Sequence, residues 1–248
     1  MGERLRDRVI IVTGGRLGIG QAFAKGLAAQ GAAVVVADLE PATETVAAIE
    51  RAGGRATSLP CDVGDEGQVA GMVQAVLDAH GRIDGLVNNA GIYPLGTLEQ
   101  TSLELWERVQ RVNVTGSFLC ARAVLPTMRA QGSGKIVNIS SGTFWMGAPG
   151  LAAYVASKGA VVGLTRALSK EVGAAGIQVN AIAPGLTETP GVAGGIPDEM
   201  FDGTVTLQAI ARRERPEDMV GAVVFLMSAD SDFMTGQVMA VDGGLVHI

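Results

Sequence analysis

The 248-residue chain has few of the residues that hold metal ions or form disulfides. It contains two cysteines, Cys61 and Cys120, and two histidines, His80 and His247, all far apart in the sequence. This spacing matches no metal-ligand pattern, and no other feature indicates the oxidising compartment in which two cysteines would pair. We therefore expect a cytoplasmic protein without a bound metal ion.

Long apolar runs and an excess of positive charge are also lacking. The first apolar run, at residues 9–12, is too short for a signal peptide, and no run reaches the roughly 18 residues of a membrane span. The formal net charge of −6 offers no attraction for nucleic acid or an anionic membrane surface. We expect neither as a partner, and a small molecule as the substrate.

Short β-branched runs alternate with longer helical stretches along the whole chain, without a linker or repeat. The runs are nearly continuously apolar, which indicates strands buried on both faces. Such alternation predicts one α/β domain over residues 1–248, a doubly wound Rossmann fold with a seven-stranded parallel sheet and helices on both faces. Predicted strands are residues 9–12, 33–37, 56–59, 83–87, 135–139, 178–182 and 238–241; predicted helices are 21–30, 42–52, 68–79, 103–129, 151–172 and 216–227.

A glycine-rich turn, TGGRLGIG at residues 13–20, lies between the first strand and the first helix. Backbone N–H groups at such a helix N-terminus bind a pyrophosphate, which the helix dipole also favours. The spacing G-x-x-x-G-x-G differs from the commoner dinucleotide fingerprint, and by itself it fits a tight turn as well. Its position in the first strand-to-helix turn favours cofactor binding, by Gly14, Arg16, Leu17, Gly18, Ile19 and Gly20.

Asp38 ends the second strand, and Leu39 follows it. A carboxylate at this position accepts hydrogen bonds from both ribose hydroxyls and repels a 2′-phosphate. The alternative is that Asp38 only caps the next helix. Arg16 complicates the prediction because a guanidinium could hold a 2′-phosphate. Since Leu17 and Leu39 offer no basic group, we expect NAD in preference to NADP.

Polar and small residues follow the third and fourth strands. Asp62 and Val63 end the third, where a carboxylate can meet the adenine amino group. Residues 88–91, NNAG, end the fourth, where small residues let the backbone lie against the cofactor ribose; two asparagines also fit a simple turn. The predicted cofactor contacts here are Asp62, Val63, Asn89, Ala90 and Gly91.

Three residues near the fifth strand form a candidate catalytic group. Ser141 ends that strand, and Tyr154 and Lys158 are four residues apart, which places them on one face of a helix. Tyrosine is a poor base at neutral pH, but a nearby ammonium and a positive nicotinamide ring both favour the phenolate. Tyr154 is therefore a plausible proton acceptor from an alcohol, or a donor to an alkoxide.

Taken in order, these motifs resemble the classical short-chain dehydrogenase/reductase family from Arg8 to the VDGG segment at residues 241–244. The resemblance implies that Ser141 binds the reacting oxygen, Tyr154 transfers the proton, and Lys158 binds the nicotinamide ribose and lowers the tyrosine pKa. Asn113 would hold a water that links Lys158 to solvent, unless it is an ordinary helix-interior polar residue. Pro184 and Gly185 would support the nicotinamide, and Thr187 and Thr189 its carboxamide. The family also implies a homotetramer.

Aromatic residues make up only 4% of the chain, so their positions are informative. Tyr93, Phe144 and Trp145 lie in loops expected to border the substrate, with Thr143, although loop packing explains them too. A segment over about residues 186–215 is expected to form a lid. Resemblance to NAD-dependent aryl secondary-alcohol dehydrogenases of the 1-phenylethanol type, and to pyridoxal 4-dehydrogenase, implies a bulky apolar alcohol as substrate.

Three other functions remain as alternatives. A 3-oxoacyl-thioester reductase would share the fold and the catalytic group but typically uses NADP, against which Asp38 argues. A dinucleotide-sensing scaffold usually lacks the tyrosine or the lysine. A methyltransferase with a similar sheet has no need of Ser141, Tyr154 and Lys158.

Overall fold

A parallel sheet of seven strands, in the order β3-β2-β1-β4-β5-β6-β7, forms the centre of the computed structural model, which describes residues 4–190 and 196–247. This order confirms the predicted doubly wound fold, because the chain reverses direction across the sheet between β1 and β4. The strands are β1 (Val9–Thr13), β2 (Ala33–Asp38), β3 (Arg55–Pro60), β4 (Gly85–Asn88), β5 (Gly134–Ile139), β6 (Ile177–Pro184) and β7 (Val238–Val241).

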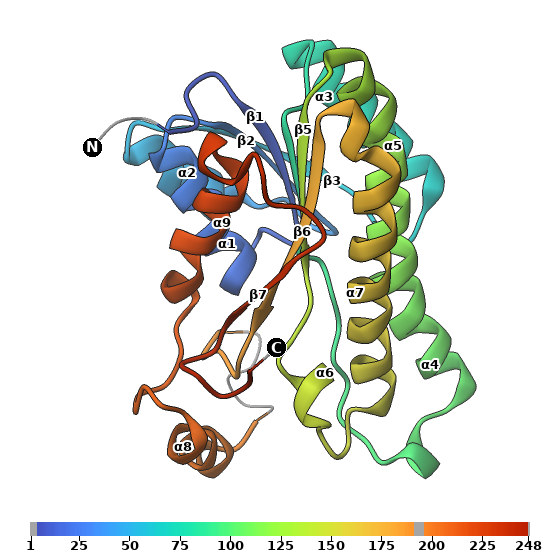
Figure 1. Cartoon of the computed structure of the whole chain (residues 1–248), viewed down its shortest axis with the longest axis vertical. Helices are drawn as coiled ribbons and strands as arrows, with labels where there is room; N and C mark the ends of the chain where they lie inside the picture. Colours follow the sequence, from blue (N-terminus) through green and yellow to red (C-terminus); the bar gives the residue numbers. More distant parts are fainter. Residues whose placement is uncertain (1–3, 191–195, 248) are drawn as a thin grey trace.

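Helices cover both faces of the sheet (Figure 1). On one face lie α1 (Gly18–Ala29), α2 (Thr43–Arg51) and α9 (Val220–Met227). On the other face lie α3 (Glu66–His80), α4 (Leu103–Gln110), α5 (Gly116–Gln131) and α7 (Ala152–Val172).

The inner strands are largely apolar because successive side chains point into two separate cores, whereas the edge strand β3 is partly exposed. In β1, Val9 and Ile11 join the core beneath α3, α5 and α7, whereas Ile10 and Val12 join the core beneath α1 and α9. All four are almost fully buried. The polar side chains inside the central strands, such as Asn138 in β5 and Asn180 in β6, are buried and hydrogen-bonded within the protein. The polar groups that can meet a ligand therefore lie at the strand ends.

The predicted helix over residues 103–129 is interrupted. Between α4 and α5 the residues Arg111–Thr115 form a π-helical segment, in which one extra residue widens the turn. The Ser117 hydroxyl donates to the carbonyl of Asn113 at 2.8 Å inside this region. Hydrophobic periodicity does not reveal the interruption, because both halves remain helical and continuous.

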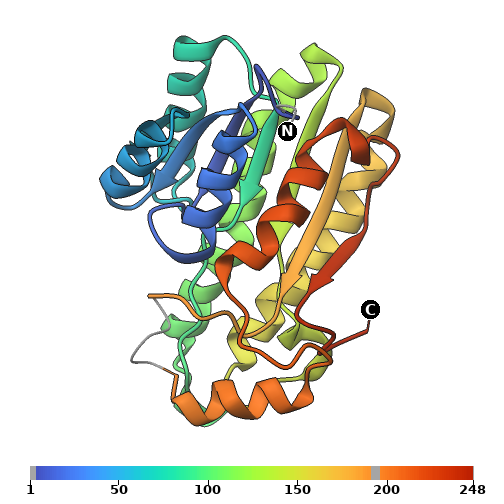
Figure 2. The ribbon, with the colours of Figure 1, turned by 90° about the vertical axis from the view of Figure 1, so that its left-hand side faces the viewer.

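Two helices were not predicted, and both lie beyond the carboxyl ends of the strands. The short α6 (Thr143–Met146) follows β5, and α8 (Asp198–Leu207) crosses below the sheet (Figure 2). The predicted lid over residues 186–215 thus contains a helix; its residues 191–195 lie outside the described residues. Within the described residues, no helix is long and apolar enough to cross a membrane.

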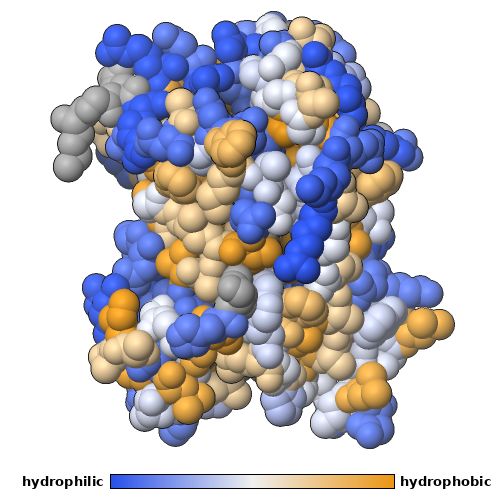
Figure 3. Space-filling view, in the orientation of Figure 1, coloured by the Kyte–Doolittle hydropathy of each residue, from blue (hydrophilic) through white to orange (hydrophobic). Residues whose placement is uncertain are grey.

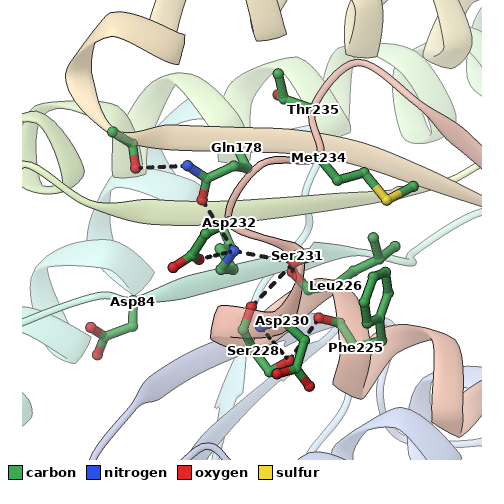
Figure 4. A network of polar contacts seen from close by, with 12 residues as sticks. Asp84, Gln178, Phe225, Leu226, Ser228, Asp230, Ser231, Asp232, Met234 and Thr235 are labelled. Carbon is green, nitrogen blue, oxygen red and sulfur yellow. Dashed lines mark hydrogen bonds and ion pairs between the residues drawn. The ribbon is translucent and has the colours of Figure 1, made fainter.

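A buried lysine, Lys135, lies at the start of β5, at the end of the sheet opposite the carboxyl ends of the strands. The Lys135 ammonium donates to Gln178 Oε1 and Ser231 Oγ, both at 3.1 Å, and lies 2.8 Å from Asp232 Oδ1. Figure 4 shows these three partners converging on one side-chain nitrogen. The contacts join β5 to β6 and to the turn before β7.

Replacing Lys135 by alanine is expected to lower the free energy of unfolding by about 2 kcal/mol, because Gln178 and Ser231 lose a charged hydrogen-bond donor. Urea unfolding followed by circular dichroism measures the change. Lys170→Ala, on the exposed side of α7, is the matched control and should stay within about 0.5 kcal/mol of the parent. An equal decrease in the free energy of unfolding of both variants would show that the hydrogen bonds of Lys135 do not stabilise the fold.

Candidate functional site

A cavity of about 680 Å³ opens at the carboxyl ends of the strands. Every residue predicted to border the cofactor lines it, including all six from the glycine-rich turn. The cavity also takes in Ser141, Tyr154 and Lys158. The structure thus brings the predicted cofactor residues and three of the four predicted catalytic residues to one place.

The glycine-rich turn is shaped by close backbone contacts. Gly14 has a φ of +64°, and a Cβ there would lie 2.8 Å from the Cα of Ala90. The Asn89 amide donates to the carbonyls of Thr13 and Gly14 at 3.0 and 2.9 Å, which fixes the turn against the end of β4. Asn89 therefore does shape a turn, whereas Asn88, at the end of β4, donates to Asn138 Oδ1 and to the carbonyl of Ser117. Ala90 and Gly91 line the cavity beside the turn.

The first turn of α1 has free donors toward the cavity. Its N-cap residue, Leu17, supplies no side-chain hydrogen bond. The first N–H groups of the helix therefore lack a capping partner, and the macrodipole adds positive potential there. An uncapped helix start beside tightly packed glycines fits the pyrophosphate of a dinucleotide.

Asp38 lies beside this turn and not at a helix start. Its carboxylate accepts a hydrogen bond from the backbone N–H of Arg16 at 3.1 Å, and the Arg16 guanidinium lies 3.9 Å from the other oxygen. The next helix begins at Thr43 after the N-cap Ala42, so the alternative that Asp38 caps a helix is wrong. Arg16 is also drawn to Glu40, at 3.5 Å.

At the end of β3, the Asp62 carboxylate is bound from two sides. It accepts a hydrogen bond from the N–H of Gly64 at 2.9 Å and forms an ion pair with Arg111 at 3.0 Å. Arg111 belongs to the π-helical segment, which therefore contacts the cavity wall. The predicted contact of Asp62 with an adenine amino group stays a prediction.

The reacting side chains come from the loop after β5 and from α7. The Lys158 ammonium donates to the carbonyl of Ile139 at 2.8 Å and lies 5.4 Å from the centre of the Tyr154 ring. The Ser141 hydroxyl oxygen accepts hydrogen bonds from the backbone N–H and the hydroxyl of Thr143, at 3.2 and 3.0 Å. Because its oxygen is already an acceptor, Ser141 can donate its own proton, either to Tyr154 or to an oxygen placed in the cavity.

Burial determines the protonation states of Tyr154 and Lys158 in the chain without cofactor. It raises the pKa of Tyr154 to about 12, although the hydrogen bond with Ser141 acts in the opposite direction. It also lowers the pKa of the Lys158 ammonium to about 8. The prediction that Lys158 lowers the tyrosine pKa stays a prediction. In the chain without cofactor, the cost of burying a phenolate outweighs the contributions that lower this pKa.

Asn113 stands behind the cavity wall. Its amide donates to the carbonyl of Ile92 and to Ser157 Oγ, both at 2.9 Å, and its Oδ1 accepts from the N–H of Ile92 at 2.8 Å. The Ser157 hydroxyl in turn donates to the carbonyl of Tyr154. Asn113 thus ties the loop after β4 to α7, and its part in a water relay stays a prediction.

The predicted substrate residues divide into two groups. Tyr93 and Thr143 line the cavity, and the Tyr93 ring meets that of Tyr154 edge-on, with centroids 6.1 Å apart. Phe144 and Trp145 are not among the lining residues; they stack edge-on with each other, and Phe144 lies against α7, where a Cβ on Gly159 would be 2.7 Å from its ring. For Phe144 and Trp145, the structure therefore supports ordinary loop packing and not the predicted contact with the substrate.

Sequence reasoning missed much of the apolar lining, since its residues are scattered over four loops and follow no periodicity. The lining residues contributed by the loops after β4, β5, β6 and β7, within the described chain, include no charged side chain. Figure 3 shows apolar residues gathered on the lower part of the molecule, over α8 and around α6. The missed residues are Ile92, Leu95, Met146, Leu151, Met200 and Leu245.

The helix α8, which contributes Met200 to the cavity, is held by one arginine. The Arg213 guanidinium lies 2.8 Å from Asp198, 2.7 Å from Asp202 and 3.3 Å from Glu188. It also stacks on the Phe201 ring at 5.1 Å. In residues 4–190 and 196–247, no group of three His, Cys, Asp or Glu side chains could hold a metal ion.

Known proteins share this fold and much of this sequence. The profile of the family described as enoyl-(acyl carrier protein) reductase matches residues 15–246. The chain is 42% identical to cis-4-hydroxycyclohexanecarboxylate dehydrogenase of Sinomonas cyclohexanicum, over all of both proteins. It is 39% identical to cyclopentanol dehydrogenase of Comamonas testosteroni, over 97% of this chain and 98% of the relative. It is 37% identical to a 3-oxoacyl-acyl-carrier-protein reductase of Thermotoga maritima, over 98% and 99%.

Two solved structures agree with these relatives. A short-chain alcohol dehydrogenase of Sinorhizobium meliloti superposes with a TM-score of 0.94 at 37% identity, over 98% of each chain. A 2-deoxy-D-gluconate 3-dehydrogenase of Agrobacterium tumefaciens, with bound NADP, has a TM-score of 0.91 at 38% identity, over 98% of each chain. The chain therefore belongs to the short-chain dehydrogenase/reductase family, whose members are oxidoreductases that use nicotinamide cofactors on secondary alcohols or ketones.

Proposed function

We propose that this protein interconverts a neutral, bulky secondary alcohol and its ketone with NAD(H) as the hydride carrier. The observation that carries the proposal is the meeting of Ser141, Tyr154 and Lys158 at the end of the cavity where the described loop residues are uncharged and many are apolar. Such a group holds an oxygen and moves its proton, while the apolar side chains accept the carbon skeleton. Arg108 and Arg111 line the cavity from the neighbouring helical segments.

The chain's part in the reaction is the handling of the substrate oxygen and its proton. Ser141 donates a hydrogen bond to that oxygen and stabilises the negative charge that develops there. In oxidation Tyr154 accepts the hydroxyl proton as the carbinol C–H bond breaks; in reduction it returns the proton to the new alkoxide. Lys158 supplies the positive charge that favours the phenolate. The nicotinamide, when bound, accepts or donates the hydride.

The substrate class follows from the lining and is supported by two relatives. Among the described lining residues, the loops after β4, β5 and β6, with α8, offer uncharged polar side chains: the hydroxyls of Tyr93, Ser140, Ser141, Thr143, Thr187, Thr189 and Thr204, and the Asn89 amide. Two of the relatives are named for alcohols on a ring: cyclopentanol, and a hydroxycyclohexane that also carries a carboxylate. A ring of that size, or an aryl group, suits a wall of leucine, isoleucine and methionine side chains.

NAD is favoured by the negative charge at the adenosine end of the cavity. Asp38 and Glu40 both face Arg16, so a 2′-phosphate would compete with two carboxylates for one guanidinium. A reductase of 3-oxoacyl thioesters is the second candidate, because the chain is 37% identical to one. Cofactor preference and substrate range distinguish the two. The homotetramer also stays a prediction, to be checked by light scattering.

Tyr154→Phe is expected to reduce kcat by about 10²- to 10⁴-fold, because the ring remains but the proton donor and acceptor is lost. Binding of NAD, followed by calorimetry, should change less than about twofold. In the parent, alcohol oxidation should speed up as pH rises from 7 to 10, because the raised pKa keeps Tyr154 protonated at neutrality. Full activity in the variant would contradict the assigned role.

Asp38→Asn is expected to reduce the preference for NAD over NADP by about tenfold, because it removes the charge that repels a 2′-phosphate. Dissociation constants for the two cofactors, measured for parent and variant at one ionic strength, give the ratio. Asp78→Asn, on the exposed surface of α3, is the matched control. A parent that binds NADP more tightly than NAD would overturn this part of the proposal.

A panel of substrates tests the class directly. With NAD, kcat/KM for cyclohexanol, cyclopentanol or 1-phenylethanol should exceed that for a 3-hydroxyacyl thioester by about tenfold or more. The reason is that the apolar ring of each alcohol is buried against the apolar side chains that line the cavity. Steady-state kinetics at saturating cofactor measures kcat/KM. Equal or higher rates with the thioester would favour the second candidate.

A further inference from the structure

A buried carboxyl stands directly behind the turn that follows β6. Glu214 is 5% exposed, and its Oε2 accepts a hydrogen bond from the N–H of Gly185 at 2.9 Å. Its backbone is joined to the same turn, through a bridge to Thr187 and a hydrogen bond from the N–H of Glu188 at 2.8 Å. Glu214 does not line the cavity itself, but Gly185 and Thr187 do.

The contact is close enough to require glycine. A Cβ on Gly185 would lie 2.6 Å from Glu214 Oε2 and 3.1 Å from the Cβ of Asp242. The carboxyl and the turn backbone are therefore packed against each other without room for water. The other oxygen of Glu214, Oε1, is buried and has no hydrogen-bond partner among the described residues.

Within the described residues no cation pairs directly with this carboxyl, and Arg212 attracts it only at longer range. Arg212, on the same segment, is bound by both oxygens of Asp218, and Arg213 is bound by α8. Asp242, after β7, also faces this region, and its carboxylate accepts N–H groups of Gly244, Leu245 and Val246.

These surroundings make the charged form costly. Burial raises the pKa of Glu214 to about 7, with smaller contributions in the same direction from Asp218 and Asp242; the hydrogen bonds from Gly185 and Thr187 oppose the rise. The group therefore changes charge near neutral pH, next to backbone that borders the cavity.

We propose that Glu214 is a positioning residue whose ionised form favours the oxidised over the reduced cofactor, through the turn from Gly185 to Thr189. A negative charge behind the turn interacts favourably with a positive nicotinamide ring and not with the neutral, reduced ring. The inference rests on the proposed placement of the nicotinamide at this turn. By linkage, the oxidised cofactor binds more tightly as pH rises through neutrality.

The test compares Glu214→Gln with the parent by calorimetry between pH 5.5 and 7.5. Glutamine keeps an acceptor for the N–H of Gly185 but imitates the neutral acid at every pH. The parent's affinity for NAD should rise about five- to tenfold over this range, and its affinity for NADH less than twofold. The variant should lose most of the rise with NAD. The Lys158 ammonium, whose pKa is about 8, adds a pH dependence above this range that persists in both proteins.

A second readout needs no cofactor. The pKa of Glu214 in the folded protein is above its unfolded value, so its stabilising effect is complete in acid and is lost as pH rises through 7. Tm of Glu214→Gln minus Tm of the parent should therefore increase between pH 5 and 8, by about 3 °C or more. Glu217→Gln, exposed on the neighbouring turn, is the matched control and should show no such increase.

Glu214→Asp supplies the rescue. It keeps a titrating carboxyl at the same place, so the pH dependence of NAD affinity should remain even where absolute affinity falls. If Glu214→Gln keeps the parent's pH dependence and its ratio of NAD to NADH affinity, the inference is wrong and the proposed function stands. If the parent binds neither NAD nor NADH, the proposed function itself fails.

Discussion

Covering both faces of one parallel sheet with helices is the constraint on which the rest of this structure depends. Because strands such as β1 bury every side chain, they leave no position for a polar group that can meet a ligand except where a strand ends. Residues that are distant in the sequence, Asp38, Asp62, Ser141 and Gly185, then meet at one edge because parallel strands share a direction. The packing of the sheet thus determines where the candidate cofactor and substrate sites lie, and the loops after the strands contribute the side chains that line them.

The same burial dominates the electrostatics of the site. Tyr154, Lys158 and Glu214 each lose hydration at the cavity or behind it, and each shifts toward its neutral form. Pairwise attraction, on which sequence reasoning relied for Tyr154, is the smaller effect in the chain by itself. A bound cofactor with a positive nicotinamide ring would therefore be needed to favour the phenolate form of Tyr154.

The sequence could predict the doubly wound parallel sheet and many of the residues that line the cavity, because apolar continuity and glycine spacing are local signals. It could place Tyr154 and Lys158 together because four residues make one helical turn. It could not separate Thr143 from Phe144 and Trp145, since which side of a short loop faces a cavity depends on neighbours such as Gly159. Glu214 was equally hidden: its burial is set by packing against the turn after β6, and its sequence context is a run of exposed arginines.

The π-helical segment between α4 and α5 has a consequence for the register of these two helices. One residue of an α-helix corresponds to a rotation of about 100°, so the extra residue turns α4 by that angle relative to α5. Gln110, at the end of α4, donates to the carbonyl of Ala153 on α7, whereas Arg122, in α5, forms an ion pair with Glu66 on α3. The extra residue therefore sets a fixed angle between the face that α4 presents to α7 and the face that α5 presents to α3.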